Sequence, residues 1–225
     1  MDDVDDYSIG LHDWMDVNPR FRILVTFLQE LETATEAIID RQRRVVGEQT
    51  EEEDLEVERY ILREMFEEVL PRTLRYSTIL HLYAALDVLL AKLCGHVESR
   101  TAASFSLSDM ASPRQLATRL RYMKKALGAH LPDDAFDQGF GLKLSAFSKV
   151  RDCIAHAGGE VSGWKARADL PGMSRALGLT IEDDYIVVSR VVVTSFLEEA
   201  RLWAVAVCRA VEKAVESAAP SRNSN

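Results

Sequence analysis

The sequence predicts an all-α protein: a helical bundle with a small β-hairpin insert before the last helix. Apolar residues recur every three or four positions over most of the chain, which is the period of amphipathic helices that share one core. One stretch, LTIEDDYIVVS, alternates like a pair of strands around an Asp183-Asp184 turn. Since it is the one such pair, we expect a hairpin inserted into a helical fold.

The N-terminal part divides into an arm and two helices. Residues 1–17 are acidic and aperiodic, which predicts a disordered arm. Asn18-Pro19 is typical of a helix start, and helical spacing predicts a helix from there to about Gly47. A charged connection leads to a second helix from about residue 55. Pro71 should interrupt or kink that helix, because proline lacks the N–H and clashes with the preceding turn.

Four further helices are predicted, most of them with clear signals at their boundaries. The most apolar helix carries TLRYSTILHLYAALDVLLAKLC and should end near Gly95. Ser112-Pro113-Arg114-Gln115 reads as a capping box that opens a helix to about Gly128. Helices over 142–157 and 191–217 complete the bundle, with a loop at 160–178 and a disordered tail at 218–225. We expect a single domain, residues 18–217, whose core covers about residues 55–217.

Charge and composition limit the function classes. The net charge of −9 argues against loose binding of nucleic acid over the whole surface. Residues 1–70 hold 20 acids and 7 bases, whereas residues 71–225 hold 16 acids and 20 bases, so an anion would bind the later part. The apolar stretches predict no membrane span, and the three distant cysteines predict buried thiols in a cytoplasmic protein. The spacing of metal-ligating residues predicts neither a metal nor a cofactor.

The stretch VRDCIAHAGG, residues 150–159, holds the main candidate site. Asp152 and His156 are four residues apart and share one helix face, so Asp152 is placed to orient the imidazole. Arg151 and His156 are five apart, about 140° around the helix, so one straight helix cannot easily aim both at one atom. Either the helix ends before His156, or a two-fold dimer brings two copies of the stretch together.

These residues suit cleavage of RNA without a metal. A histidine can take the proton from a ribose 2′-hydroxyl, and a guanidinium can hold the phosphate and the charge that develops on it. The alternative is structural: Asp152 and His156 are a surface helix pair, and Arg151 packs at the edge of the core.

Two more features place charged residues where they need a structural or functional explanation. Asp87 is the one acid in a very apolar helix, so it needs a cationic partner from a neighbouring helix, for which Arg151 is an attractive choice. The second feature is a basic helix with Tyr122 as a candidate stacking residue; it predicts a face that binds the RNA backbone, or else an ordinary solvated face. Its candidate RNA-binding residues are Arg114, Arg119, Arg121, Lys124 and Lys125.

RDCIAHAGG resembles the RxxxxH signature of HEPN domains, small α-helical domains of higher eukaryotes and prokaryotes. The earlier apolar helix with its acid, the hairpin and the closing helix extend the resemblance over about residues 55–217, and residues 1–50 carry none. The resemblance implies a metal-independent endoribonuclease, in some members a toxin or an antiviral effector. It would work as a homodimer with a composite active site.

Carried over by position, Arg151 would stabilise the phosphate, His156 would be the general base or acid, and Asp152 would be the polar residue after the arginine. Many relatives have asparagine at the position of Asp152, and Asp87 would match the acid of the earlier helix. RNA and an antitoxin or regulatory protein would be the partners. The alternatives are an inactive HEPN-like scaffold and a nucleotide sensor that holds a phosphate without cleaving it.

Overall fold

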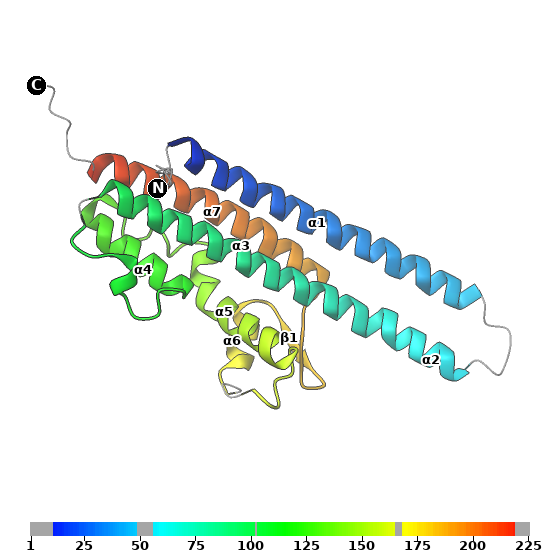
Figure 1. Cartoon of the computed structure of the whole chain (residues 1–225). Helices are drawn as coiled ribbons and strands as arrows, with labels where there is room; N and C mark the ends of the chain where they lie inside the picture. Colours follow the sequence, from blue (N-terminus) through cyan, green and yellow to red (C-terminus); the bar gives the residue numbers. More distant parts are fainter. Residues whose placement is uncertain (1–10, 49–55, 102, 165–167, 219–225) are drawn as a thin grey trace, which may run out of the picture. The chain divides into compact units, whose positions relative to one another are not determined.

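The computed structural model describes residues 11–48, 56–101, 103–164 and 168–218, and Figure 1 shows its elements. Over these residues the protein is mostly helical, with one antiparallel two-stranded hairpin directly before the last helix. The predicted fold class is therefore confirmed. The predicted C-terminal tail lies outside the described residues, except Ala218, which belongs to the last helix.

Helices account for most elements in chain order. They are α1 (Leu11–Glu48), α2 (Glu56–Glu64), the π-helical turn η2 (Met65–Val69), α3 (Leu70–Arg100), the 3₁₀ turn η3 (Leu107–Asp109), α4 (Leu116–Leu127), the 3₁₀ turn η4 (Gly128–His130), α5 (Phe140–Ala157), α6 (Leu170–Ala176), β1 (Thr180–Glu182), β2 (Tyr185–Val187) and α7 (Arg190–Ala218).

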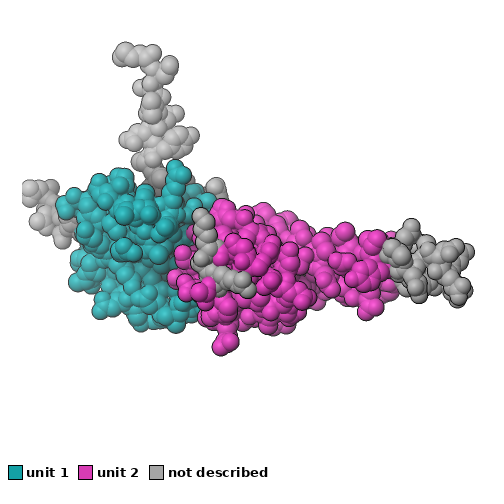
Figure 2. Space-filling view, turned by 90° about the horizontal axis from the view of Figure 1, so that it is seen from below, with its two compact units in different colours: residues 1–24, 84–144, 199–225 teal, residues 25–83, 145–198 magenta. Residues whose placement is uncertain are grey.

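The chain forms two compact units, coloured teal and magenta in Figure 2. Unit 1 comprises residues 1–24, 84–144 and 199–225, and unit 2 comprises residues 25–83 and 145–198. Helices α1, α3, α5 and α7 contribute residues to both. In unit 2 the buried ring of Phe147 packs edge-on against Phe196, with 5.9 Å between centroids. In unit 1 the indole N–H of Trp203 donates to the carbonyl of Phe136 at 3.3 Å.

The first helix begins earlier than the sequence predicts. Helix α1 starts at Leu11, so residues 11–17 are helical rather than part of a disordered arm, and Pro19 lies inside the helix. Residues 1–10 of the predicted arm lie outside the described residues. The end of α1 at Glu48 agrees with the expected end near Gly47.

The region around Pro71 stays helical, because the backbone widens by one residue just before it. The N–H of Leu70 donates to the carbonyl of Met65, five residues earlier, which is the bond of a π-turn. Such a turn relieves the clash between a proline ring and the preceding turn, so α3 continues through Pro71. Gly95 does not end α3 either; an interior glycine costs a helix only about 1 kcal/mol, and α3 runs to Arg100.

The continuous helix Tyr60–Arg100 is long and apolar enough, by length and composition, to cross a membrane. This differs from the expectation that no stretch reaches that length. Half of its most apolar window is buried inside the protein, and core helices of ordinary globular proteins meet the same criterion.

Two loops also differ from the expectation. Helix α4 begins at Leu116 rather than at Pro113, because Ser112 has φ of 57° and residues 112–115 form a turn, closed by a hydrogen bond from the N–H of Gln115 to the carbonyl of Ser112. Within the expected loop 160–178, residues Leu170–Ala176 form α6. The other boundaries, including α5 ending at Ala157 and the hairpin turn at Asp183-Asp184, are as predicted.

The three cysteines are all buried and free, as expected. Burial raises the pKa of Cys94 and of Cys208 to about 12 and raises that of Cys153. Thiols held neutral in this way are poor nucleophiles, so we assign them to packing.

Candidate functional site

Helix α5 places the RxxxxH motif outside the core of unit 2. Phe147, Val150 and Ile154 form its buried stripe, at 0%, 0% and 5% exposure. Because the motif residues fall between these positions, their side chains point away from the core and reach solvent. Arg151 and Asp152 are about one third exposed, and His156 is exposed.

Arg151 is held by two contacts. Its Nη1 donates to Oδ1 of Asp152 at 2.9 Å, and its guanidinium carbon lies 4.3 Å from the centroid of the Tyr83 ring on α3. Together these contacts fix the plane of the guanidinium. Its Nε is buried and has no hydrogen-bond partner in the described part of the chain. Any external acceptor would therefore have to approach the exposed part of the guanidinium rather than Nε.

His156 is positioned by an aromatic ring rather than by a carboxylate. Its imidazole is parallel to the indole of Trp164, with 1° between the planes and 6.4 Å between the centroids. The expected contact between Asp152 and His156 is not formed, because Asp152 pairs with the adjacent guanidinium, a stronger attraction than an imidazole. Tyr83 and Trp164 are the two site residues that the sequence argument missed. Neither stands at a motif spacing from Arg151 or His156.

The end of α5 is fixed to the hairpin by the backbone. Gly158 and Gly159 have φ of 60° and 83°, and the N–H of Gly159 donates to the carbonyl of Cys153, six residues earlier, as in a Schellman cap. The carbonyl of Gly159 then accepts from the N–H of Ile186 in β2 at 3.0 Å. Tyr76 on α3 donates to the carbonyl of Ile186 at 2.5 Å. These bonds fix the turn that follows His156.

Asp87 has the cationic partner that its apolar helix requires, but the partner is Arg119 rather than Arg151. Nη1 of Arg119, on α4, donates to Oδ1 of Asp87 at 2.6 Å and also to the backbone carbonyl of Asp87. Arg119 is 7% exposed. The prediction that Arg151 is the partner of Asp87 was wrong, because α4 is the element that packs on this part of α3 within unit 1. A buried guanidinium pairs with the carboxylate that it can reach.

The basic helix α4 presents fewer charges than its sequence suggests. Arg114, Arg121 and Lys125 are exposed, and Lys125 lies 4.2 Å from the centroid of the Phe105 ring. Lys124 reaches Oδ2 of Asp137 at 2.5 Å. Because Arg119 is buried and paired, we withdraw it from the candidate RNA-binding set.

Tyr122 does not serve as a stacking platform. Its side chain is fully buried and packs edge-on against Phe105, with 5.6 Å between ring centroids. Burial raises the pKa of its hydroxyl to about 12. A nucleobase cannot stack on this ring, so the remaining candidates on and just before α4 could contribute to RNA binding through their charge alone.

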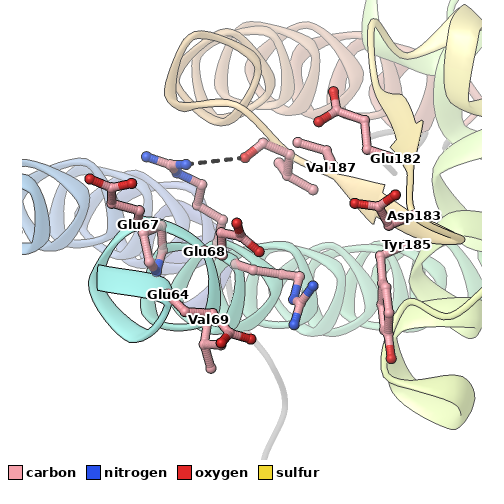
Figure 3. A pocket seen from close by; sticks show the side chains of 12 residues that line it. Glu64, Glu67, Glu68, Val69, Glu182, Asp183, Tyr185 and Val187 are labelled. Atoms are coloured by element: carbon pink, nitrogen blue, oxygen red, sulfur yellow. Dashed lines mark hydrogen bonds between the residues drawn. The ribbon is translucent and has the colours of Figure 1, made fainter. Parts of the chain in front are cut away.

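A cavity of about 430 Å³ in unit 2 was not anticipated from the sequence (Figure 3). It lies between the start of α3 and the hairpin, and Arg75 at its edge is neutralised by Glu32 and Glu36. Its carboxylates would repel an RNA phosphate, so this cavity is not a candidate RNA site. Its acidic lining residues are Glu64, Glu67, Glu68, Glu182 and Asp183.

Among the described residues, no group of three or more His, Cys, Asp or Glu side chains could hold a metal ion. The motif of α5 belongs to unit 2, and the basic face of α4 belongs to unit 1. Comparison of the chain with protein-family models, with curated proteins and with solved structures finds no match.

Proposed function

We propose that this protein is a metal-independent endoribonuclease in which Arg151 and His156 are the catalytic residues. The observation that carries the proposal is the state of Arg151. Tyr83 and Asp152 hold its guanidinium in place, and the side chain remains 31% exposed. A phosphate oxygen could reach the exposed part of this guanidinium and receive a charge-assisted hydrogen bond.

The chemistry needs only these side chains and the RNA itself. His156 takes the proton from a ribose 2′-hydroxyl, whose oxygen then attacks the adjacent phosphorus. Arg151 stabilises the charge that develops on the non-bridging oxygens. The bond to the 5′-oxygen breaks, and that oxygen takes a proton from a protonated histidine. The products are a 2′,3′-cyclic phosphate and a 5′-hydroxyl end.

A second copy of the chain would complete the site. Arg151 and His156 of one chain make no contact with each other, and the helical repeat turns them about 140° apart. In a two-fold homodimer, the exposed faces of two α5 helices could place two arginines and two histidines around one phosphate. His156 of the partner subunit would then be the acid that protonates the leaving oxygen.

One observation favours a second candidate function, an inactive scaffold. The ion pair between Arg151 and Asp152 neutralises part of the charge that a phosphate would meet. In a scaffold, this pair would simply stabilise the surface of α5. The two candidates differ in whether purified protein cleaves RNA.

The test is cleavage of a labelled single-stranded RNA by purified protein in the presence of a chelator. We expect Arg151→Ala and His156→Ala each to lower the cleavage rate about 100-fold or more, because each removes one catalytic group. Lys149→Ala, which changes an exposed cation on the same helix, is the matched control and should keep full activity. Unchanged cleavage in both motif variants would reject Arg151 and His156 as the catalytic residues, and no cleavage by the folded wild type would reject the ribonuclease in favour of the scaffold.

A further inference from the structure

Helix α1 carries an apolar stripe that the rest of the described chain leaves uncovered. Phe27 and Ile38 are each 55% exposed, Leu31 is 37% exposed and Val45 is 38% exposed. All four lie within the part of α1 that belongs to unit 2. Buried residues of the same helix, including Leu28, Thr35 and Ile39, occupy the adjacent face, about 100° around the helix.

The spacing of the stripe is that of a coiled-coil seam. Positions 27, 31, 34, 38, 41 and 45 are separated alternately by four and three residues, which keeps them within about 80° of the helix circumference. They carry Phe27, Leu31, Ala34, Ile38, Arg41 and Val45, so one cation interrupts an otherwise apolar row. A row of this kind fits the same row on another helix, with knobs that insert into holes.

The charges beside the stripe identify that other helix. Glu30 borders the stripe at one end, and Arg41 and Arg44 lie within or beside it at the other. All three are exposed, and within the described residues none has an ion-pair partner. Glu30 and Arg44 are 14 residues apart, about 21 Å along the helix, so they cannot pair within one chain. A two-fold axis across the stripe would bring each beside the opposite charge.

We propose that α1 pairs antiparallel with α1 of a second copy of this chain through this stripe. In the register that aligns the two rows, Phe27 faces Val45 of the partner subunit, and the small Ala34 faces Ile38 of the partner subunit. Glu30 lies beside Arg44 of the partner subunit, and Arg41 lies close enough to share that carboxylate. The pairing depends on neither the RxxxxH motif nor RNA cleavage.

The first experiment measures the molar mass of the full chain by light scattering after gel filtration. We expect Phe27→Glu together with Ile38→Glu to halve the mass, because each introduced carboxylate would be buried in the seam against an apolar residue, Val45 or Ala34 of the partner subunit. Leu202→Glu is the matched control: Leu202 is also 55% exposed, but it lies on α7, and its substitution should leave the mass unchanged. Equal masses for the seam variant and the wild type, with unchanged helical circular dichroism, would overturn the proposal.

A charge exchange tests the antiparallel register and does not require disruption of the seam. Glu30→Arg should weaken the dimer about tenfold, because two like-charge contacts replace two ion pairs. Adding Arg44→Glu in the same chain should restore the wild-type dissociation constant. If the double variant dimerises as weakly as the single variant, the antiparallel pairing is wrong. RNA cleavage by the seam variant is measured in parallel, so that failure here is distinguished from failure of the proposed ribonuclease activity.

Discussion

The residue on which the candidate site depends most for its shape is Gly159. It follows the C-terminus of α5 with φ of 83°, a conformation that residues with a Cβ rarely adopt. A Cβ at this position would lie 2.2 Å from the hydroxyl oxygen of Tyr76. The same hydroxyl donates to Ile186, so it cannot move without loss of that bond. Close packing and backbone conformation therefore both require glycine here.

We expect Gly159→Ala to lower the free energy of unfolding by about 3 kcal/mol, the sum of an unfavourable φ and an overpacked contact. Urea denaturation followed by circular dichroism measures this value. Gly95→Ala is the control with the opposite sign, since Gly95 lies inside α3 with nothing within 4 Å of the added Cβ. That variant should gain about 0.5–1 kcal/mol. Equal effects in the two variants would contradict the role assigned to Gly159.

At the scale of one residue, the sequence shows that a charged group needs a partner, but it does not show which residue is that partner. The carboxylate of Asp87 in an apolar helix demands a cation, and the structure supplies one. That the cation is Arg119 depends on which helix packs nearby, and no local spacing encodes this. Tyr83 and Trp164 were missed for a similar reason: the contact of Tyr83 with Arg151 depends on how α3 packs, and that of Trp164 with His156 depends on the course of the chain after α5.

At the scale of elements, α4 shows how tertiary structure edits a charge pattern. Residues 111–130 contain no acid, yet Asp137 from the following turn reaches Lys124, and Arg119 turns inward to Asp87. The exposed cations Arg114, Arg121 and Lys125, together with the partly paired Lys124, are what remains for an RNA backbone. A ligand face inferred from one helix alone therefore overstates its charge.

We expect Lys124→Gln with Lys125→Gln to flatten the salt dependence of single-stranded RNA binding. Two fewer phosphate contacts should reduce the slope of log K against log salt by about 1.4, or by less if the pair with Asp137 already occupies Lys124. Binding of a fluorescent oligonucleotide, measured at several salt concentrations, gives the slope. Lys149→Gln on α5 is the control. An unchanged slope in the double variant would remove α4 from the RNA-binding surface.

Most helices and the hairpin follow from the sequence because apolar period and turn residues act locally. The errors are at boundaries, where weak local signals compete with packing: α1 starts at Leu11 in spite of Pro19, and α3 continues past both Pro71 and Gly95. Helix α6 was missed because its seven residues include a proline and a glycine, and its burial against its own unit stabilises it.

At the scale of the whole molecule, pH couples to folding through a buried histidine. His96 is 5% exposed on α3, and burial, assisted by Arg100, lowers its pKa below 6.5, while Glu212 opposes the shift. The unfolded chain therefore binds a proton more readily than the folded one. The stability that this difference contributes is complete above about pH 6.5 and is lost as pH falls toward the folded pKa.

We expect the free energy of unfolding of the wild type to fall between pH 7.5 and pH 5, and His96→Leu to reduce that fall. The substitution also removes any hydrogen bond of the imidazole, which lowers stability equally at both pH values; the readout is therefore the difference between the two pH values.

Glu212→Gln gives the complementary test. Without that carboxylate the folded pKa of His96 falls further, so stability should continue to decline to lower pH than in the wild type. Urea denaturation at each pH measures all three proteins. If His96→Leu and the wild type lose equal stability over this range, His96 is not the group responsible. The variant lacks the imidazole, so an equal loss would have to come from other titrating groups.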